Sequence, residues 1–112
     1  MSEENDHSLK EKVALIERRM TEIMRSYCSE KFSITHYGAY DIHPRHLVFW
    51  ICVETDQLKQ FLTCNSALNS DLSLALIEYD YPAEGIDSVY IGFESQETVD
   101  RESGGNWWHH WK

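Results

Sequence analysis

The sequence has few cysteines, no long apolar run and no obvious targeting segment, and each of these deficits narrows the possible classes of protein. Its three cysteines, Cys28, Cys52 and Cys64, are widely spaced and form no C-x-x-C motif, which disfavours a disulfide framework or a zinc ribbon. The longest apolar run, Leu47 to Val53, is far too short to cross a bilayer, and the opening MSEENDH is polar and acidic. We therefore expect a cytoplasmic protein without a membrane partner.

Basic residues are also scarce, since 10 Lys and Arg stand against 19 Asp and Glu and give a net charge of −9. The imbalance is concentrated in residues 78–102, which hold eight acids and a single base, Arg101. A negative surface repels nucleic-acid phosphates and speeds encounters with basic partners. The charge disfavours nucleic acid and favours a basic protein as the partner, although solubility alone also explains an acidic chain.

The length and aromatic content indicate one folded domain. A chain of 112 residues is the size of an ordinary domain, and its four tryptophans and 12% aromatic residues supply a packed core. There are no repeats, low-complexity tracts or internal linkers. We expect a single α+β domain over residues 1–112, with residues 1–7 disordered.

The first half of the chain predicts a helix followed by a β-hairpin. Ser8 and Glu11 fit a capping box, and an apolar stripe with steps of three and four residues runs from Leu9 to Tyr27. Residues 32–37 alternate as a strand does, residues 41–45 contain a proline turn, and residues 46–53 are almost continuously apolar. Such a run is typical of a central strand that is covered on both faces.

The second half predicts two helices, a third strand and a structured tail. Thr55 or Asp56 can cap a short helix, and residues 72–79 have helical spacing after possible caps at 70 and 71. Residues 83–88 are expected to form a loop and residues 89–93 a strand. Ser95 can cap a helical turn that Gly104 and Gly105 end in a left-handed conformation. Residues 106–111 are expected to form a fourth strand.

These elements together predict a two-layer α+β sandwich. Its helices would pack on one face of a largely antiparallel sheet of three or four strands.

The most distinctive segment begins at residue 93 and reads FESQETVDRESGGNWW. It resembles the C-terminal end of small bacterial proteins that share an "ESQETVDR…GGNW" signature, some of which look like immunity proteins of polymorphic toxin systems. The similarity extends from Tyr81 onward. It implies a family and carries no established activity with it.

The same segment places carboxylates beside indoles, a combination that suits capture of a basic protein. The alternative is that the tryptophans enter the core and Arg101 pairs with a nearby acid. In a strand, the two adjacent tryptophans would point to opposite faces. The predicted partner-binding residues are Glu94, Glu97, Asp100, Glu102, Trp107 and Trp108.

Metal binding and catalysis have weaker support in the sequence. His36, His43 and His46 lack a recognised zinc spacing, and the adjacent His109 and His110 would diverge on a strand. No P-loop, G-x-S-x-G or G-x-G-x-x-G motif occurs. We therefore expect no metal and no cofactor.

Three hypotheses follow for the function. The first is a non-enzymatic protein-binding protein, most concretely an immunity or antitoxin-like protein whose acidic C-terminal third blocks a basic toxin domain. The second is a small enzyme or ligand-binding domain that uses Glu97, Asp100 and His109 in a cleft. The third is a structural homodimer built from the first helix or from an exposed sheet edge.

Overall fold

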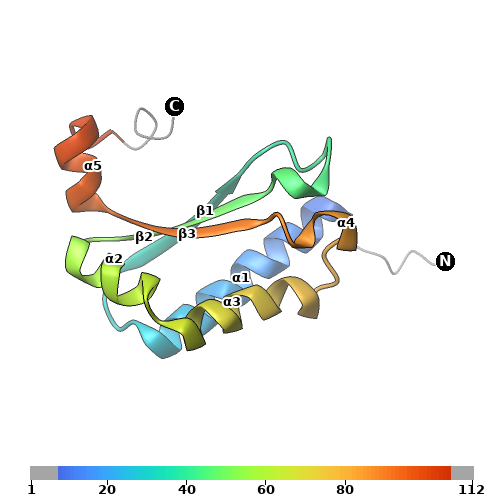
Figure 1. Cartoon of the computed structure of the whole chain (residues 1–112), viewed down its shortest axis with the longest axis horizontal. Coiled ribbons are helices and arrows are strands. Elements are labelled where there is room, and N and C mark those ends of the chain that lie inside the picture. The colour runs from blue at the N-terminus through green and yellow to red at the C-terminus, as the bar shows by residue number, and fades with distance from the viewer. Residues whose placement is uncertain (1–7, 107–112) are drawn as a thin grey trace.

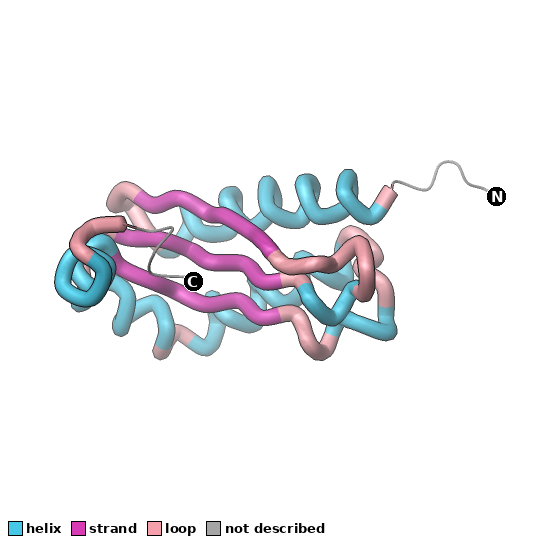
Figure 2. Tube along the Cα trace, turned by 90° about the horizontal axis from the view of Figure 1, so that it is seen from above, coloured by secondary structure: helices cyan, strands magenta, loops and turns pink. Residues whose placement is uncertain are grey.

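The computed structural model describes residues 8–106, so the predicted disorder of residues 1–7 lies outside the described residues. Within the described part, three strands form one mixed sheet in the order β1-β2-β3 (Figure 2). β1 (Phe32–Tyr37) pairs antiparallel with β2 (Val48–Val53), whereas β3 (Tyr90–Ser95) pairs parallel with β2. The central position predicted for the second strand is therefore confirmed.

The hairpin between β1 and β2 is confirmed, but its second strand starts later than predicted. A 3₁₀ helix, η1 (Pro44–His46), precedes β2, so His46 is not part of the strand. The proline fixes the backbone angle at the start of η1. The imidazole Nδ1 of His43 then accepts the N–H of Arg45 at 3.1 Å, which caps the turn.

The first helix, α1 (Leu9–Tyr27), forms as the sequence predicts. Its capping box is complete, since the Ser8 hydroxyl accepts the Glu11 N–H at 3.2 Å and the Glu11 carboxylate accepts the Ser8 N–H at 2.9 Å. The apolar stripe of the helix is buried against the sheet and is made of Val13, Ile16, Met20, Ile23 and Met24.

Three helices connect β2 to β3, in place of the two helices and a loop that the sequence predicted. They are α2 (Asp56–Thr63), α3 (Ser66–Glu78) and the short α4 (Ala83–Ile86), which replaces the expected loop. α3 also begins earlier than predicted, because the Asn65 side chain, rather than residue 70 or 71, caps it by accepting the Leu68 N–H at 3.0 Å. Asparagine is among the best residues for this position.

The helices α1 and α3 lie side by side on one face of the sheet (Figure 1). On β2, Phe49, Ile51 and Val53 point toward them and are buried, whereas Val48, Trp50 and Cys52 point to the other face and are half-buried. This alternation corrects the prediction of a strand covered on both faces, because the face away from the helices is only half-buried. α5 (Gln96–Ser103) stands at one end of that other face (Figure 1).

The predicted α+β class and the packing of helices on one face of a sheet agree with the structure. The sheet is half parallel, because β3 reaches β2 through the helical connection rather than through a hairpin. The predicted fourth strand lies almost wholly outside the described residues, and Asn106, its first residue, is not in a strand. Among residues 8–106, no helix combines the length and apolar character needed to traverse a bilayer.

Candidate partner-binding surface at the end of β3

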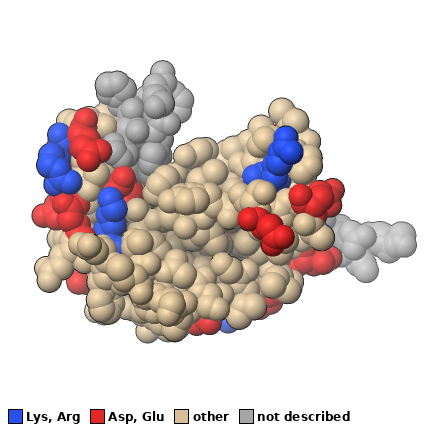
Figure 3. Space-filling view, in the orientation of Figure 1, with Lys and Arg blue, Asp and Glu red and all other residues tan. Residues whose placement is uncertain are grey.

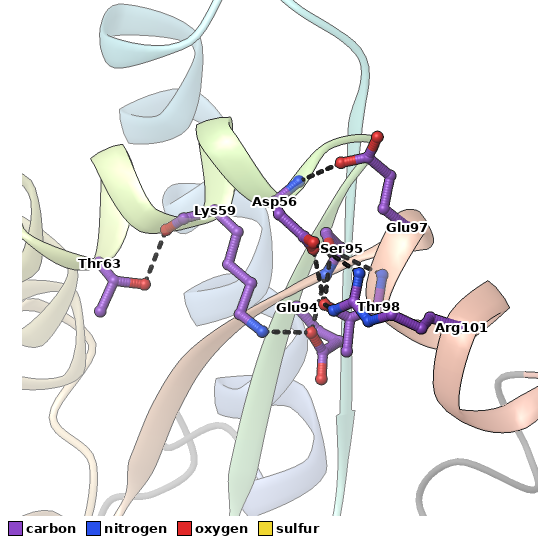
Figure 4. Close-up of polar contacts among 8 residues, drawn as sticks. All are labelled: Asp56, Lys59, Thr63, Glu94, Ser95, Glu97, Thr98 and Arg101. Carbon is purple, nitrogen blue, oxygen red and sulfur yellow. Dashed lines mark hydrogen bonds and ion pairs between the residues drawn. The ribbon is translucent and has the colours of Figure 1, made fainter.

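α5 begins where the two parallel strands end. Val53 of β2 and Ser95 of β3 are register partners, and each strand leads into a helix within three residues. Thr55 caps α2 by accepting the Leu58 N–H at 3.2 Å, and Ser95 caps α5 by accepting the Thr98 N–H at 3.1 Å. Two helix N-termini therefore meet at the end of the sheet where β2 and β3 stop (Figure 4).

Asp56 is the central acceptor between these two helices. Its carboxylate accepts the hydroxyls of Ser95 and of Thr98, the latter at 2.6 Å, and the Nη1 of Arg101 at 2.9 Å (Figure 4). The hydrogen bond from Ser95, followed by those from Thr98 and Arg101, lowers the pKa of Asp56 well below its ordinary range. The carboxylate therefore stays ionised and ties the first turn of α2 to the N-cap, the first turn and the last turn of α5.

Glu97 makes the reciprocal connection from α5 to α2. Its Oε1 accepts the backbone N–H of Asp56 at 2.7 Å, and its own N–H donates to the carbonyl of Glu54 at 3.2 Å. Carboxylates are stabilised at helix N-termini by the unpaired N–H groups and the helix dipole. Because each helix supplies an acid to the other, the direction of α5 relative to the sheet is fixed.

The predicted acidic residues of α5 are exposed, and the helical spacing puts Glu97 and Asp100 on one face and Glu102 on another. Glu97, Asp100 and Glu102 are all exposed, as is Arg101. Asp100 accepts the Nε2 of Gln96 at 2.9 Å, one helical turn before it. After Ser103 the helix ends at Gly104 and Gly105, whose φ angles of 60° and 84° confirm the predicted left-handed stop.

Glu94 does not belong to this exposed group. Its residue is only 7% exposed, and its carboxylate binds the Nζ of Lys59 at 2.7 Å and the N–H of Ser95 at 3.0 Å. Side chains in β3 alternate between the two faces of the sheet, and this alternation buries the Glu94 side chain against the sheet. The spacing of acids in the sequence does not reveal this burial. The other predicted members, Trp107 and Trp108, lie outside the described residues.

The sheet face beside α5 carries aromatic side chains that the sequence analysis did not single out. Tyr37, Trp50 and Tyr90 come from β1, β2 and β3, and the Trp50 Nε1 donates to the Tyr37 hydroxyl at 2.9 Å. The rings of Trp50 and Tyr90 meet edge to face with centroids 5.4 Å apart. Gly92 makes room for both rings, because a Cβ atom there would lie 2.5 Å from the Tyr90 ring and 2.9 Å from Trp50. Period-two alternation in the three strands was the signal that could have grouped these residues.

A shallow cavity of about 360 Å³ opens between β1, β2 and the start of α5. Cys52 lines it, and burial raises the pKa of the thiol to about 11, so the group stays protonated and is a poor nucleophile near neutral pH. Gln96, rather than Glu97 or Asp100, is the α5 residue that lines the cavity. His109, the third member of the enzymatic hypothesis, lies outside the described residues.

The histidines within the described range make local contacts. The His36 Nδ1 is 2.6 Å from the Glu17 carboxylate, which links β1 to α1, and the rings of His43 and His46 lie 6.1 Å apart. Across residues 8–106, no group of three or more His, Cys, Asp or Glu side chains is arranged to hold a metal ion. His109 and His110 fall outside that range.

No known protein family, curated protein or solved structure matches this chain in sequence or in fold. The function therefore has to be inferred from the chemistry of its own residues.

Proposed function

We propose that this chain is a non-enzymatic protein-binding protein that holds a basic partner against α5. The observation that supports this proposal most directly is the exposure of Glu97, Asp100 and Glu102 on a helix that Asp56 ties to the ends of two strands. A binding helix that is already fixed loses little conformational freedom when its partner arrives. The carboxylates can then form ion pairs without first ordering a loop.

The charge of the whole chain supports the same partner class. A net charge of −9 attracts basic proteins over distances of about the Debye length, roughly 8 Å at physiological ionic strength, and so raises their association rate. Charged groups at the rim of an interface contribute mainly to this rate and to partner choice. The acids of α5 would act in this way.

The most concrete form of the proposal is an immunity or antitoxin-like protein that covers a basic toxin domain. Toxins that cut nucleic acid carry positive surfaces because they must bind phosphates, and an acidic inhibitor competes for those surfaces. The segment from Tyr81 onward, which resembles small bacterial proteins of which some look like immunity proteins, suggested this role but carries no established activity with it.

The test is rescue of a toxin in a co-expression experiment. The chain is expressed with the protein encoded immediately upstream of its gene, and protection of the host cells is measured. We expect protection by the natural chain and reduced protection by Asp100→Asn/Glu102→Gln. Because an exposed ion pair contributes about 0.5–1 kcal/mol, this double variant should bind the purified toxin roughly 5- to 30-fold more weakly.

The matched control removes the same charge elsewhere. Asp41 and Glu30 are exposed acids that lie outside α5, and Asp41→Asn/Glu30→Gln should keep nearly all of the affinity. Equal loss in both double variants would show that only the net charge matters, which contradicts a binding surface on α5. The immunity role is contradicted if the protein encoded upstream is not toxic, or if this chain does not protect the host cells from it.

A further inference from the structure

The first four residues of β3 lack the lysines, prolines and bulges that keep many edge strands from pairing with other chains, although α2 contacts β3 and its Lys59 reaches Glu94 near the end of the strand. Edge strands in natural proteins carry lysines, prolines or bulges, whereas the first four residues of β3 read Tyr-Ile-Gly-Phe. No described strand pairs with this edge, since β3 is the last strand of the sheet. The Tyr90 N–H donates to the Leu47 carbonyl, so the alternation of the strand turns the N–H and C=O groups of Ile91 and Phe93 away from β2.

The outer stripe of α3, on the same side of the molecule, is also uncharged (Figure 1). It is formed by exposed residues at helical spacing, namely Ser66, Ser70, Ser73 and Ile77, of which Ile77 is 64% exposed. The two acids of α3 point toward α1 instead. Asp71 accepts the Tyr27 hydroxyl at 2.7 Å, and Glu78 pairs with Arg19 at 3.2 Å.

The charged residues on this side lie toward the two ends of the molecule and along its lower rim, and they leave the middle of the face uncharged (Figure 3). Two copies of a chain with a net charge of −9 repel each other wherever their acids meet. An uncharged side is where this repulsion is smallest, and the serines of α3 are small enough for a second helix to approach closely. The electrostatics of this surface therefore suit another copy of the same chain rather than a basic partner.

We propose that a second copy of this chain pairs antiparallel with the outer edge of β3, so that two three-stranded sheets become one continuous sheet across a twofold axis. The axis would pass beside Gly92. Ile91 of each copy would face Phe93 of the other and exchange two hydrogen bonds with it, while the α3 helices pack against each other below. Lys59 binds Glu94 at the end of the strand, and a lysine beside an edge discourages pairing there, which confines the contact to residues 90–93.

This interface is separate from α5 and does not depend on the function proposed for α5. Its first test is the mass of the purified chain by light scattering as a function of concentration. We expect twice the chain mass of 13.2 kDa for the natural protein. Ser70→Glu/Ser73→Glu places like charges on both sides of the axis and should weaken the dimer at least tenfold. Ala14→Glu, an exposed change on α1, should leave it intact.

The second test uses the natural chain alone and asks whether the outer edge of β3 forms the dimer contact. Amide hydrogen exchange is compared at concentrations below and above dimer formation. The amides of Ile91 and Phe93 should exchange at least tenfold more slowly in the dimer, because they become hydrogen-bonded across the axis. A chain that stays monomeric at millimolar concentration overturns the proposal. So does a dimer that survives the serine substitutions or leaves these two amides unprotected.

Discussion

A carboxylate that accepts hydrogen bonds from two hydroxyls and a guanidinium binds a proton only at low pH, and Asp56 is in this position. The same residue occupies the first turn of α2, so its ionisation holds two helices rather than one. The attachment of α5 to the sheet is largely polar, because only two of its residues are buried, Thr98 and Val99, and only Val99 is apolar. Loss of the Asp56 charge should therefore weaken the attachment of α5 before it affects the rest of the fold.

The first prediction concerns pH. The folded pKa of Asp56 is lowered, so its contribution to stability is complete above the ordinary aspartate pKa. It is lost as the pH falls toward the folded value, because the unfolded chain takes up the proton first. Urea unfolding at pH 6 and pH 3 should show a larger loss in the natural chain than in Asp56→Asn. Identical losses in the two proteins would contradict this role.

The second prediction concerns two glycines with positive φ angles. Gly38 has a φ of 112°, and a Cβ atom there would collide with the His46 carbonyl oxygen, whereas Gly104 has a φ of 60° and open space around it. Gly38→Ala should cost roughly 2–5 kcal/mol of unfolding free energy from strain and overlap together. Gly104→Ala should cost only about 1–2 kcal/mol. Chemical denaturation of both variants measures the difference.

At the scale of elements, the joint between α2 and α3 is held by one amide. The Nδ2 of Asn69 lies within 3.2 Å of the carbonyl oxygens of Leu62, Thr63 and Asn65, at the end of α2 and the start of α3. Helix C-termini leave such carbonyls without helical partners. Asn69 therefore keeps the crossover compact on its way back to the sheet.

The third prediction tests this joint. Asn69→Ala should lower the unfolding free energy by about 1–2 kcal/mol through the lost hydrogen bonds. Asn69→Asp should be worse than Asn69→Ala, because its oxygens cannot donate and would face three carbonyl oxygens. Thermal denaturation at neutral pH gives the order of the two variants. The reverse order would show that the side-chain amide does not hold the joint.

The success of sequence prediction differed between elements for physical reasons. α1 was predicted well because its caps and its apolar stripe are local. The start of α3 was missed because residues 65–70 are mostly polar, so the cap was placed at residue 70 or 71 instead of at Asn65. The parallel pairing of β3 was also missed, since nothing within residues 89–93 records which strand they join or in which direction.

At the scale of the whole molecule, the candidate site was predicted only in part. The spacing of acids in the sequence placed Glu97, Asp100 and Glu102 on one helix correctly, but it included Glu94, whose strand geometry buries it. Asp56 was seen only as a possible helix cap, because its partners Ser95, Thr98 and Arg101 lie about 40 residues away in the chain. Contacts of that range depend on the sheet register.

The fourth prediction follows from the net charge of −9. If the partner is basic, the association rate constant should fall as salt rises from 0.01 to 0.15 M, since the Debye length shortens from about 30 to about 8 Å. The dissociation rate should change much less. Stopped-flow mixing over this salt range measures both constants. An association rate that does not depend on salt would contradict electrostatic steering.

The parallel pairing of β2 with β3 also has a consequence for how the chain folds. Val48 pairs with Tyr90, which lies 42 residues later in the chain, whereas the pairing of Val48 with Tyr37 closes only the hairpin loop. Closing the longer loop is slower, so the hairpin and α1 should assemble early and β3 should be the last strand to join. Until β3 joins, one edge of β2 has no strand partner. Substitutions in α3 or β3 should mainly prolong the time for which this edge is exposed and so increase aggregation during refolding.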